Sequence, residues 1–423
     1  MIKKTRQMGL NGVLAGIFLQ LSATPLIARY AADFCVDQNG HGDFKTVTGA
    51  LQSLPMFNYE RVTIFIKNGV YTEKIRIDCD YVTLRGENRA ETIIRYAQLR
   101  SDWEKNKDSI GPAVINIHSD DVILENLTIE NTQPEIGPHA FTIYGTGTRT
   151  IIQQCNVYSR GGDTVALWNY KEGKYYLADC SISGAVDFVC PRGWCFMRDC
   201  QLYGHKKTAA LWHAGGYCRD QKFVIVNTKF DGVPDFRLGR HHYEAQFYLV
   251  NCQFSEALSD VPVYYVSYPD APERNRPFNW GKRTYFYNCH REGNDFDWFV
   301  DNLHEADGSP EADDLTAVWT FAGDWDPESP SGPAIQYYDF DENSVIFQFN
   351  EIVSVSGKPV LKTVTGKSLH YHSGGGSDTI RFDSTEPLVG RDFEQPLQVS
   401  SGQLFGTVAS LEPRPVDFNM RIE

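Results

Sequence analysis

Two aspartates lie in glycine-rich segments that follow similar stretches of sequence. Asp163 belongs to Gly161–Thr164 (GGDT), eight residues after Cys155, and Asp187 belongs to Gly184–Val189 (GAVDFV), seven residues after Cys180. If the two stretches form successive turns of a coiled β-structure, these turns stack ~4.8 Å apart and the carboxylates lie side by side. Two carboxylates that close cannot both ionise easily, so the pKa of one is raised. Such a pair can supply a nucleophile and an acid/base.

The spacing alone leaves a second interpretation open, in which both aspartates cap backbone groups in turns. Other chemistries have no matching pattern. The sequence has no G-x-S-x-G nucleophile elbow and no Walker motif, and Gly145–Thr148 (GTGT) is a fragment of a dinucleotide-binding motif that is better explained as a turn. It has no C-x-x-C or H-E-x-x-H motif either. We therefore expect neither a cofactor nor a metal site.

A short unit recurs along the middle of the chain, mostly at steps of 20 to 28 residues. Each copy reads polar, small or apolar, polar, apolar, which is the alternation of a β-strand. This period suits one coil of a parallel β-solenoid, in which each turn returns a strand beside the last. The residue at the second position is predicted to point inward and stack as a ladder. The copies begin at Asn126, Gln154, Asp179, Asp199, Asn227 and Asn251, with a weaker one at Asn288.

Half of the ten cysteines occupy this second position, which favours small buried side chains over disulfides. They are Cys155, Cys180, Cys200, Cys252 and Cys289. Cys190 and Cys195 are the pair near enough in sequence to bridge locally. In an exported protein a disulfide between them is an open alternative.

The segments on either side of the repeat predict how it begins and ends. Residues 46–54 have the pattern of a short amphipathic helix ended by Pro55, and such a helix can cover the open end of a solenoid. First strands are predicted at Val62–Ile66 and Tyr81–Leu84. Beyond a linker-like Ser329–Pro333, alternating segments such as Val345–Phe349 predict a small all-β sandwich over 335–423. We assign this module no chemistry.

The N-terminus has the composition of a signal peptide. Lys3, Lys4 and Arg6 precede an apolar stretch over 8–28 that ends among small residues, so we expect residues 1–31 to be removed on export to the periplasm or the extracellular space. A membrane anchor is the alternative, but Asn11 and Pro25 weaken a spanning helix. The net charge of −14 and pI near 5.3 argue against nucleic-acid binding.

Several motifs, in order along the chain, resemble those of the pectin methylesterase family, also called pectinesterases. The resemblance covers about Phe34 to Glu328 and points to a divergent bacterial member with a C-terminal Ig-like module. It implies an all-β fold, a right-handed parallel β-helix over 32–328, followed by the β-sandwich. The motifs outside the aspartate segments are Gly42–Val47, Gly69–Ile75, Leu84–Gly86 and Asn126–Thr132.

The resemblance also implies roles for three residues. Asp163 matches the family's general acid/base, Asp187 its nucleophile, and Arg240, in Leu238–Arg240, the arginine that pairs with the nucleophile. The implied enzyme is a carboxylic ester hydrolase that releases methanol from methyl-esterified galacturonic acid in pectic polysaccharide, through a covalent acyl intermediate. No nucleic-acid or membrane partner is implied after removal of the signal, and we expect a monomer.

The sequence departs from the family at the substrate side of the site. The family's two oxyanion glutamines correspond to His139 and Gly162, so one donor is lost and His139 is a candidate replacement. The sugar-stacking tryptophan after the arginine corresponds to His242. Trp168 and Trp212 are candidates to rebuild the stacking surface, although packing in the core or at the rim explains them equally well. A shifted substrate, such as a branched pectic polymer or rhamnogalacturonan, follows as a hypothesis.

Two other classes of protein stay open. A lyase needs calcium-binding acids with a basic residue, and a galacturonase needs acids around an Asp-Asp pair. Within the repeat only Asp120-Asp121 forms such a pair, and it directly precedes a predicted strand. The other class is a non-catalytic β-helix, or one of different specificity, that binds pectic polysaccharide and has lost the glutamines with the activity.

Overall fold

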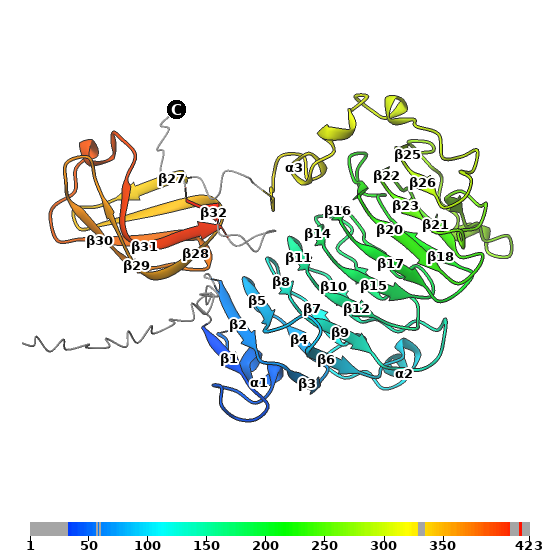
Figure 1. Cartoon of the computed structure of the whole chain (residues 1–423), viewed down its shortest axis with the longest axis horizontal. Coiled ribbons are helices and arrows are strands. Elements are labelled where there is room, and N and C mark those ends of the chain that lie inside the picture. Colours follow the sequence, from blue (N-terminus) through cyan, green and yellow to red (C-terminus); the bar gives the residue numbers. More distant parts are fainter. Residues whose placement is uncertain (1–32, 56–57, 59–60, 329–334, 407–413, 417–423) are drawn as a thin grey trace, which may run out of the picture. The chain divides into compact units, whose positions relative to one another are not determined.

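The structure is a computed structural model that describes residues 33–55, 58, 61–328, 335–406 and 414–416. The predicted signal peptide and the predicted Ser329–Pro333 linker lie outside these residues. Two folded parts, a β-helix and a C-terminal sheet, are described separately (Figure 1).

The first part is a right-handed parallel β-helix, as predicted, and most of its coils contribute strands to three sheets (Figure 1). Sheet A comprises β1 (Phe34–Val36), β2 (Val62–Ile66), β5 (Val82–Gly86), β8 (Ile123–Glu125), β11 (Thr150–Gln153), β14 (Lys174–Ala178), β16 (Trp194–Arg198), β19 (Phe223–Val226), β22 (Phe247–Val250) and β25 (Thr284–Tyr287).

Sheet B follows sheet A in each coil from β2 onward. It comprises β3 (Gly69–Thr72), β6 (Thr92–Tyr96), β9 (Thr128–Asn131), β12 (Asn156–Tyr158), β15 (Ser181–Gly184), β17 (Gln201–Gly204), β20 (Lys229–Gly232), β23 (Gln253–Phe254) and β26 (His290–Arg291).

Sheet C completes the coil in two pieces. The first holds β4 (Ile75–Ile77), β7 (Ile115–Ile117), β10 (Ile143–Gly145) and β13 (Val165–Leu167), and the second holds β18 (Ala209–Trp212), β21 (Arg237–His241) and β24 (Tyr264–Tyr265). Single bridges from Val165 to Val189 and from Val189 to Leu211 join the pieces in register.

The repeated unit is explained by the corner between sheets A and B. Its first residue, a polar one, adopts the left-handed conformation in every copy, with φ between 48° and 56°. Asn and Asp tolerate this region better than other non-glycine residues. The second residue turns inward and is fully buried, for example Cys155 at 0% and Cys180 at 1% exposure. The strand therefore begins only at the third residue, two positions later than the alternation suggested.

The inward ladder is confirmed, and so is the role of its cysteines as small core side chains. All ten cysteines are free thiols, all of them in the described residues. The disulfide left open between Cys190 and Cys195 is therefore absent: Cys195 faces the core in β16, whereas Cys190 packs on the outer face of sheet C.

The two ends of the β-helix core are covered. Helix α1 (Val47–Gln52), with Thr46 as its N-cap, buries Val47, Ala50 and Leu51 against the first coils, as predicted. At the far end Phe296, Trp298 and Phe299 pack on the last rungs. The following segment holds η2 (Leu303–Glu305), η3 (Ala312–Asp314) and α3 (Ala317–Thr320) and packs on the outer face of sheet A.

The connections between sheets B and C differ in length, and the long ones stand beside sheet C. Most have about half a dozen residues or fewer, but 97–114, between β6 and β7, contains helix α2 (Arg100–Lys105), and 132–142 follows on the next coil. On the other edge of sheet C, residues 266–283 include η1 (Pro272–Arg274). Residues of the 97–114 connection and side chains on the outer face of sheet C together line a pocket.

The C-terminal part is an antiparallel β-structure with its own core, which fits the predicted sandwich. Its long central strand bends through irregular registers and pairs with every other strand except the last. The elements are β27 (Ile335–Phe340), β28 (Ser344–Lys362), β29 (Ser368–Ser373), β30 (Ser377–Ser384), η4 (Gly390–Phe393), β31 (Gln398–Gly406) and β32 (Arg414–Pro415).

Candidate active site

Asp163 and Asp187 occupy equivalent corners of successive coils, where sheet B turns into sheet C. The N–H of Asp163 donates to the carbonyl of Val186 at 2.8 Å, and the N–H of Asp187 donates to the carbonyl of Ala209 at 2.7 Å. Both aspartates have left-handed backbone, with φ of 56° and 48°. The hydrogen-bonded register places them one above the other, as the sequence spacing predicted, and both are buried, each 6% exposed.

Arg240 reaches Asp187 from strand β21. Its Nε and one terminal nitrogen each lie 2.8 Å from a different carboxylate oxygen, which is a bidentate ion pair. Burial raises the pKa of Asp187, Arg240 opposes that rise, and the negative charge of Asp163 adds to it. The guanidinium thus keeps a desolvated carboxylate ionised and fixes its orientation.

Asp163 is held by two other side chains. Nδ1 of His139 lies 2.9 Å from Oδ2, and the thiol of Cys190 donates a long hydrogen bond of 3.5 Å to Oδ1. The hydrogen bond to Asp163 raises the pKa of His139 against the opposing effect of desolvation. Burial and the nearby Asp163 raise the pKa of the Cys190 thiol, so it stays protonated and acts as a donor.

Gly162 makes room for this imidazole. His139 and Gly162 form a parallel bridge between neighbouring coils. A Cβ atom at position 162 would lie 3.0 Å from Nδ1 of His139 and 3.0 Å from the carbonyl oxygen of Val186. The two departures from the family motif are therefore spatially coupled. The expectation that His139 replaces an oxyanion donor stays untested, since its Nδ1 is directed at Asp163.

An apolar layer covers the outer face of sheet C beside the aspartates. It contains Phe141, Ala166 and Cys190, with Trp212 at 6% exposure. Trp212 is therefore almost fully buried and packs within this apolar layer. Trp168 is more open and carries the Arg192 guanidinium 4.3 Å from its ring centroid.

His242 directly follows strand β21, two residues after Arg240. Its Nδ1 is 2.8 Å from the hydroxyl of Tyr268, and the two rings stack with centroids 5.2 Å apart. Burial, assisted by the charge of Arg240, lowers the pKa of His242 to about 4, so this histidine is neutral. The His242 ring also lies near Trp212, with ring centroids 6.3 Å apart.

Sequence inspection missed two neighbours of the site. Cys190 was considered only as half of a disulfide, and Arg192 was not considered. Both follow Asp187 in the same segment (DFVCPR), so their position directly after the predicted site residue was a usable signal. Which side of the sheet each would occupy depended on the coil register.

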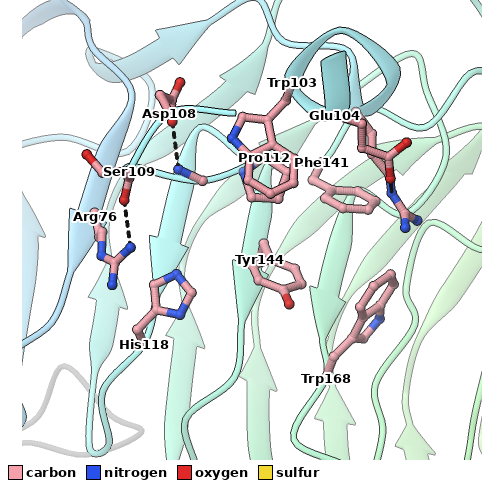
Figure 2. Close-up of a pocket in the computed structure, with 12 residues that line it drawn as sticks. Arg76, Trp103, Glu104, Asp108, Ser109, Pro112, His118, Phe141, Tyr144 and Trp168 are labelled. Atoms are coloured by element: carbon pink, nitrogen blue, oxygen red, sulfur yellow. Dashed lines mark hydrogen bonds and ion pairs between the residues drawn. The ribbon is translucent and has the colours of Figure 1, made fainter. Parts of the chain in front are cut away.

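A pocket of about 270 Å³ lies between helix α2 and the outer face of sheet C, and Phe141 and Trp168 of its lining also belong to the apolar layer beside the aspartates (Figure 2). Its floor is formed by side chains from successive coils, including His118, Tyr144 and Trp168, and its roof by Trp103 and Pro112. Trp168 packs edge-on against both Phe141 and Tyr144. Of the described residues, no group of three or more His, Cys, Asp or Glu is arranged to hold a metal ion.

Comparison with known proteins agrees with this geometry. The family model described as Pectinesterase matches residues 33–213, which contain both aspartates. Pectinesterase QRT1 of Arabidopsis thaliana is 29% identical over 274 residues, covering 61% of this chain and 69% of that protein. Probable pectinesterase 49 of the same plant is 31% identical over 181 residues, covering 40% of this chain and 46% of that protein.

Solved structures show the same β-helix. A pectin methylesterase in complex with a hexasaccharide has a TM-score of 0.57 at 21% identity and covers 71% of this chain and 99% of its own. Pectin methylesterase PemA from Erwinia chrysanthemi has a TM-score of 0.56 at 21% identity with the same coverage. The chain is thus similar to pectinesterases in both sequence and fold. The resemblance read from its motifs is confirmed, as is the β-helix.

Other curated pectinesterases align over a smaller part of their length. The chain spans 46% of Probable pectinesterase 49 and 58% of Pectinesterase 31, about half of each. Of the residues that the structure describes, none forms a helix long and apolar enough to cross a membrane.

Proposed function

We propose that this chain is a pectin methylesterase, which hydrolyses methyl esters of galacturonic acid in pectic polysaccharide and releases methanol. The observation that carries the proposal is the stacked pair of Asp163 and Asp187 with Arg240 bidentate on Asp187. The two carboxylates have different partners, one a guanidinium and the other an imidazole and a thiol. Different surroundings are what separate the roles of two otherwise equal acids.

Asp187 is the nucleophile in this proposal. Arg240 keeps its carboxylate ionised, and the bidentate contact leaves the carboxylate facing in one direction. A carboxylate oxygen attacks the ester carbonyl carbon, and the tetrahedral intermediate expels methoxide to leave a sugar acyl group on Asp187. Arg240 acts as a positioning residue for this step.

Asp163 governs the proton transfers. Departure of methoxide requires a proton, and attack of water on the acyl intermediate requires its removal. Asp163 lies one coil from the nucleophile at the equivalent corner, so both steps occur on the same side of the ester. Hydrolysis then returns Asp187 as a carboxylate and releases the free uronic acid.

Export and chain organisation are further parts of the proposal. We propose that residues 1–31 form a removable signal, that residues 32–328 form the catalytic domain, and that 335–423 form an accessory module of a monomeric secreted protein. The charged start and apolar stretch of the N-terminus support this. N-terminal sequencing of protein recovered outside the cytoplasm tests it, and an intact Met1 would refute it.

Methanol release from pectin tests the activity. The substrates are highly methylated homogalacturonan and methylated, rhamnogalacturonan-rich pectin, each treated with the wild type and with Asp187→Ala. We expect release by the wild type and at least a 10³-fold lower rate for the variant. The better polymer identifies the substrate class. A folded wild type that binds both polymers but releases no methanol would favour the non-catalytic binding protein instead.

A further inference from the structure

The contact between His139 and Asp163 bears on where the proton that the reaction needs is held. Nδ1 of His139 points at Oδ2 of Asp163 at 2.9 Å, whereas Asp163 is 8% exposed and His139 46% exposed in their side chains. A hydrogen bond from Nδ1 leaves Nε2 as the ring nitrogen that can meet a reactant. Of the two side chains in this contact, the imidazole is therefore the one that is open to a reactant.

We propose that His139 and Asp163 form a single proton-holding pair, in which His139 transfers the proton at Nε2 and Asp163 orients and stabilises the imidazolium. His139 is then a catalytic residue for the proposed esterase reaction, on which this inference rests. In the resting state the pair holds one proton, which is ready for the first half-reaction.

The steps balance without another reactant. In the first, Asp187 forms a bond to the ester carbon, the bond from that carbon to methoxide breaks, and methoxide takes the proton from Nε2 of His139. In the second, neutral His139 removes a proton from water, the hydroxide oxygen bonds to the acyl carbon, and the bond to Asp187 breaks. The products are methanol and a uronic acid, and the pair regains its proton.

The surroundings of His139 support this assignment. The groups that act on its pKa are Asp163 first and then, more weakly, Arg100, which lowers it, and Asp187, which raises it. The backbone holds the ring in place as well, since the carbonyl of His139 accepts from the N–H of Arg100 at 2.9 Å. Gly162 leaves the space that the ring fills.

Histidine NMR tests the pair without relying on activity. In the full-length protein with ¹⁵N-labelled histidine, His139→Gln identifies the resonance, and Asp163→Asn should move its titration to lower pH because the stabilising carboxylate is lost. An unchanged titration would overturn the pair. His304→Gln, an exposed histidine of η2, is the matched control and should leave the His139 signal unaffected.

The pH dependence of methanol release tests the catalytic role. His139→Gln should lower kcat about 10²-fold or more, with little change in KM, and remove the basic limb of the profile that reflects loss of the imidazolium. A residue with a purely structural role would lower activity equally at every pH. Full activity with an unchanged profile would show that Asp163 exchanges the proton directly, contrary to the proposal.

A second inference comes independently from the pocket beneath α2. Its wall is a built structure: Lys74, which is almost fully buried, pairs with Asp108, and the Asp108 carboxylate also accepts from the N–H groups of Ile110 and Gly111, both at 3.0 Å. Arg76 donates to the carbonyl of Ser109 at 2.6 Å. The pocket is thus preformed before any ligand enters (Figure 2).

Each charged side chain that lines the pocket has an ion-pair partner, whereas Arg192, outside the lining, lies over the Trp168 ring. Arg76 contacts Asp78 through both carboxylate oxygens at 2.7 and 2.8 Å, and Arg100 contacts Glu104 at 2.8 Å. The four charged residues lining the pocket, Arg76, Arg100, Glu104 and Asp108, have a formal sum of zero. A free carboxylate entering the pocket would meet no uncommitted cation among them and would approach Glu104.

We infer that this pocket receives one uncharged sugar unit of the substrate, either a uronic acid that is still esterified or a neutral branch sugar. Aromatic side chains with a few polar groups are typical of such sites, and about 270 Å³ is near the lower end of the ~300–1,000 Å³ range of ligand pockets. The inference deepens the proposed function by defining a preference for highly esterified or branched pectin.

Calorimetry on an inert variant tests this preference. Asp187→Asn is titrated with fully methyl-esterified and with de-esterified oligogalacturonide, and the esterified oligomer should bind at least several-fold more tightly. Adding Trp103→Ala should remove that advantage, whereas Tyr203→Ala, an exposed aromatic on β17 of sheet B, should not. Methanol assayed in the same cell reveals separately whether the proposed nucleophile was wrong.

A second variant tests the role of charge in this preference. Adding Glu104→Gln frees Arg100 from its partner, so binding of the de-esterified oligomer should improve by roughly threefold, in line with the energy of an exposed ion pair. Equal affinity for both oligomers in Asp187→Asn, or no response to Trp103→Ala, would overturn the inference.

Discussion

The guanidinium of Arg240 meets both carboxylate oxygens of Asp187 at 2.8 Å across 53 residues of sequence. The contact joins strand β21 to the corner that holds Asp187 and places a fixed cation beside a carboxylate that burial would otherwise favour in its neutral form. Both the charge and the shape of Arg240 matter for this contact, because a planar guanidinium binds a carboxylate through two hydrogen bonds, whereas an ammonium does not.

Replacing Arg240 by lysine should therefore cost much of the activity although the charge is kept. We expect kcat/KM for methanol release to fall by about 10²-fold, since orientation of the nucleophile is lost. Arg237→Lys, on the same strand, is the control and should stay near wild type. A lysine variant with wild-type kinetics would mean that charge alone matters at this position.

The acid limb of the pH profile should report Asp187. Because its pKa is raised, the nucleophile is lost to protonation at a higher pH than for an ordinary aspartate near 3.9. Arg240 opposes this rise, so Arg240→Gln should move the acid limb of kcat/KM further toward neutral pH. Movement of the limb to lower pH would contradict the assignment of Asp187 as the group that must be ionised.

Gly162→Ala should disturb the site through His139. The new Cβ would stand 3.0 Å from Nδ1 of His139 and from a backbone oxygen, so the ring has to shift away from Asp163. A drop in kcat of about tenfold is expected, with the histidine titration altered in parallel. Gly216→Ala, whose Cβ would meet only Glu244 at 3.9 Å, is the control. Unchanged kinetics in Gly162→Ala would show that the ring has freedom to move without consequence.

The left-handed corners should be visible in stability. Asn227 has φ of 51°, so Asn227→Ala places a residue that tolerates this region poorly and should lower the free energy of unfolding of the β-helix by about 1 kcal/mol. Asn227→Gly should be less harmful, since glycine adopts positive φ without steric cost. Denaturant titration monitored by circular dichroism compares the two, and an alanine variant as stable as the glycine variant would argue against the corner geometry.

Free thiols can be counted directly. All ten cysteines are unpaired in the structure, so denatured protein that has never met a reductant should react with ten equivalents of a thiol reagent. A count of eight would indicate one disulfide and would make Cys190 and Cys195 the first pair to examine by mass spectrometry.

Much of the scaffold could be predicted because it rests on local rules. The polar residue that opens each repeat tolerates the left-handed corner, the small residue after it fits the interior, and the period returns each strand to its neighbour. The order of the motifs was enough to place Asp163 above Asp187. The strands of sheet C were not predicted, since strands of about three residues show too little alternation to be recognised. The 97–114 connection with helix α2 was not predicted either.

What the sequence alone determined is therefore the β-helix, the paired aspartates and the identity of the arginine that pairs with Asp187. Only the tertiary structure decided which side chain meets which: His139 bonds to Asp163 because Gly162 leaves space on the adjacent coil, and Trp212 is buried while Trp168 stays open. The physical reason is that hydrogen bonding sets the ~4.8 Å spacing of coils uniformly. The lengths of the turns, in contrast, decide the lateral register, and with it the partner of every outward-facing side chain.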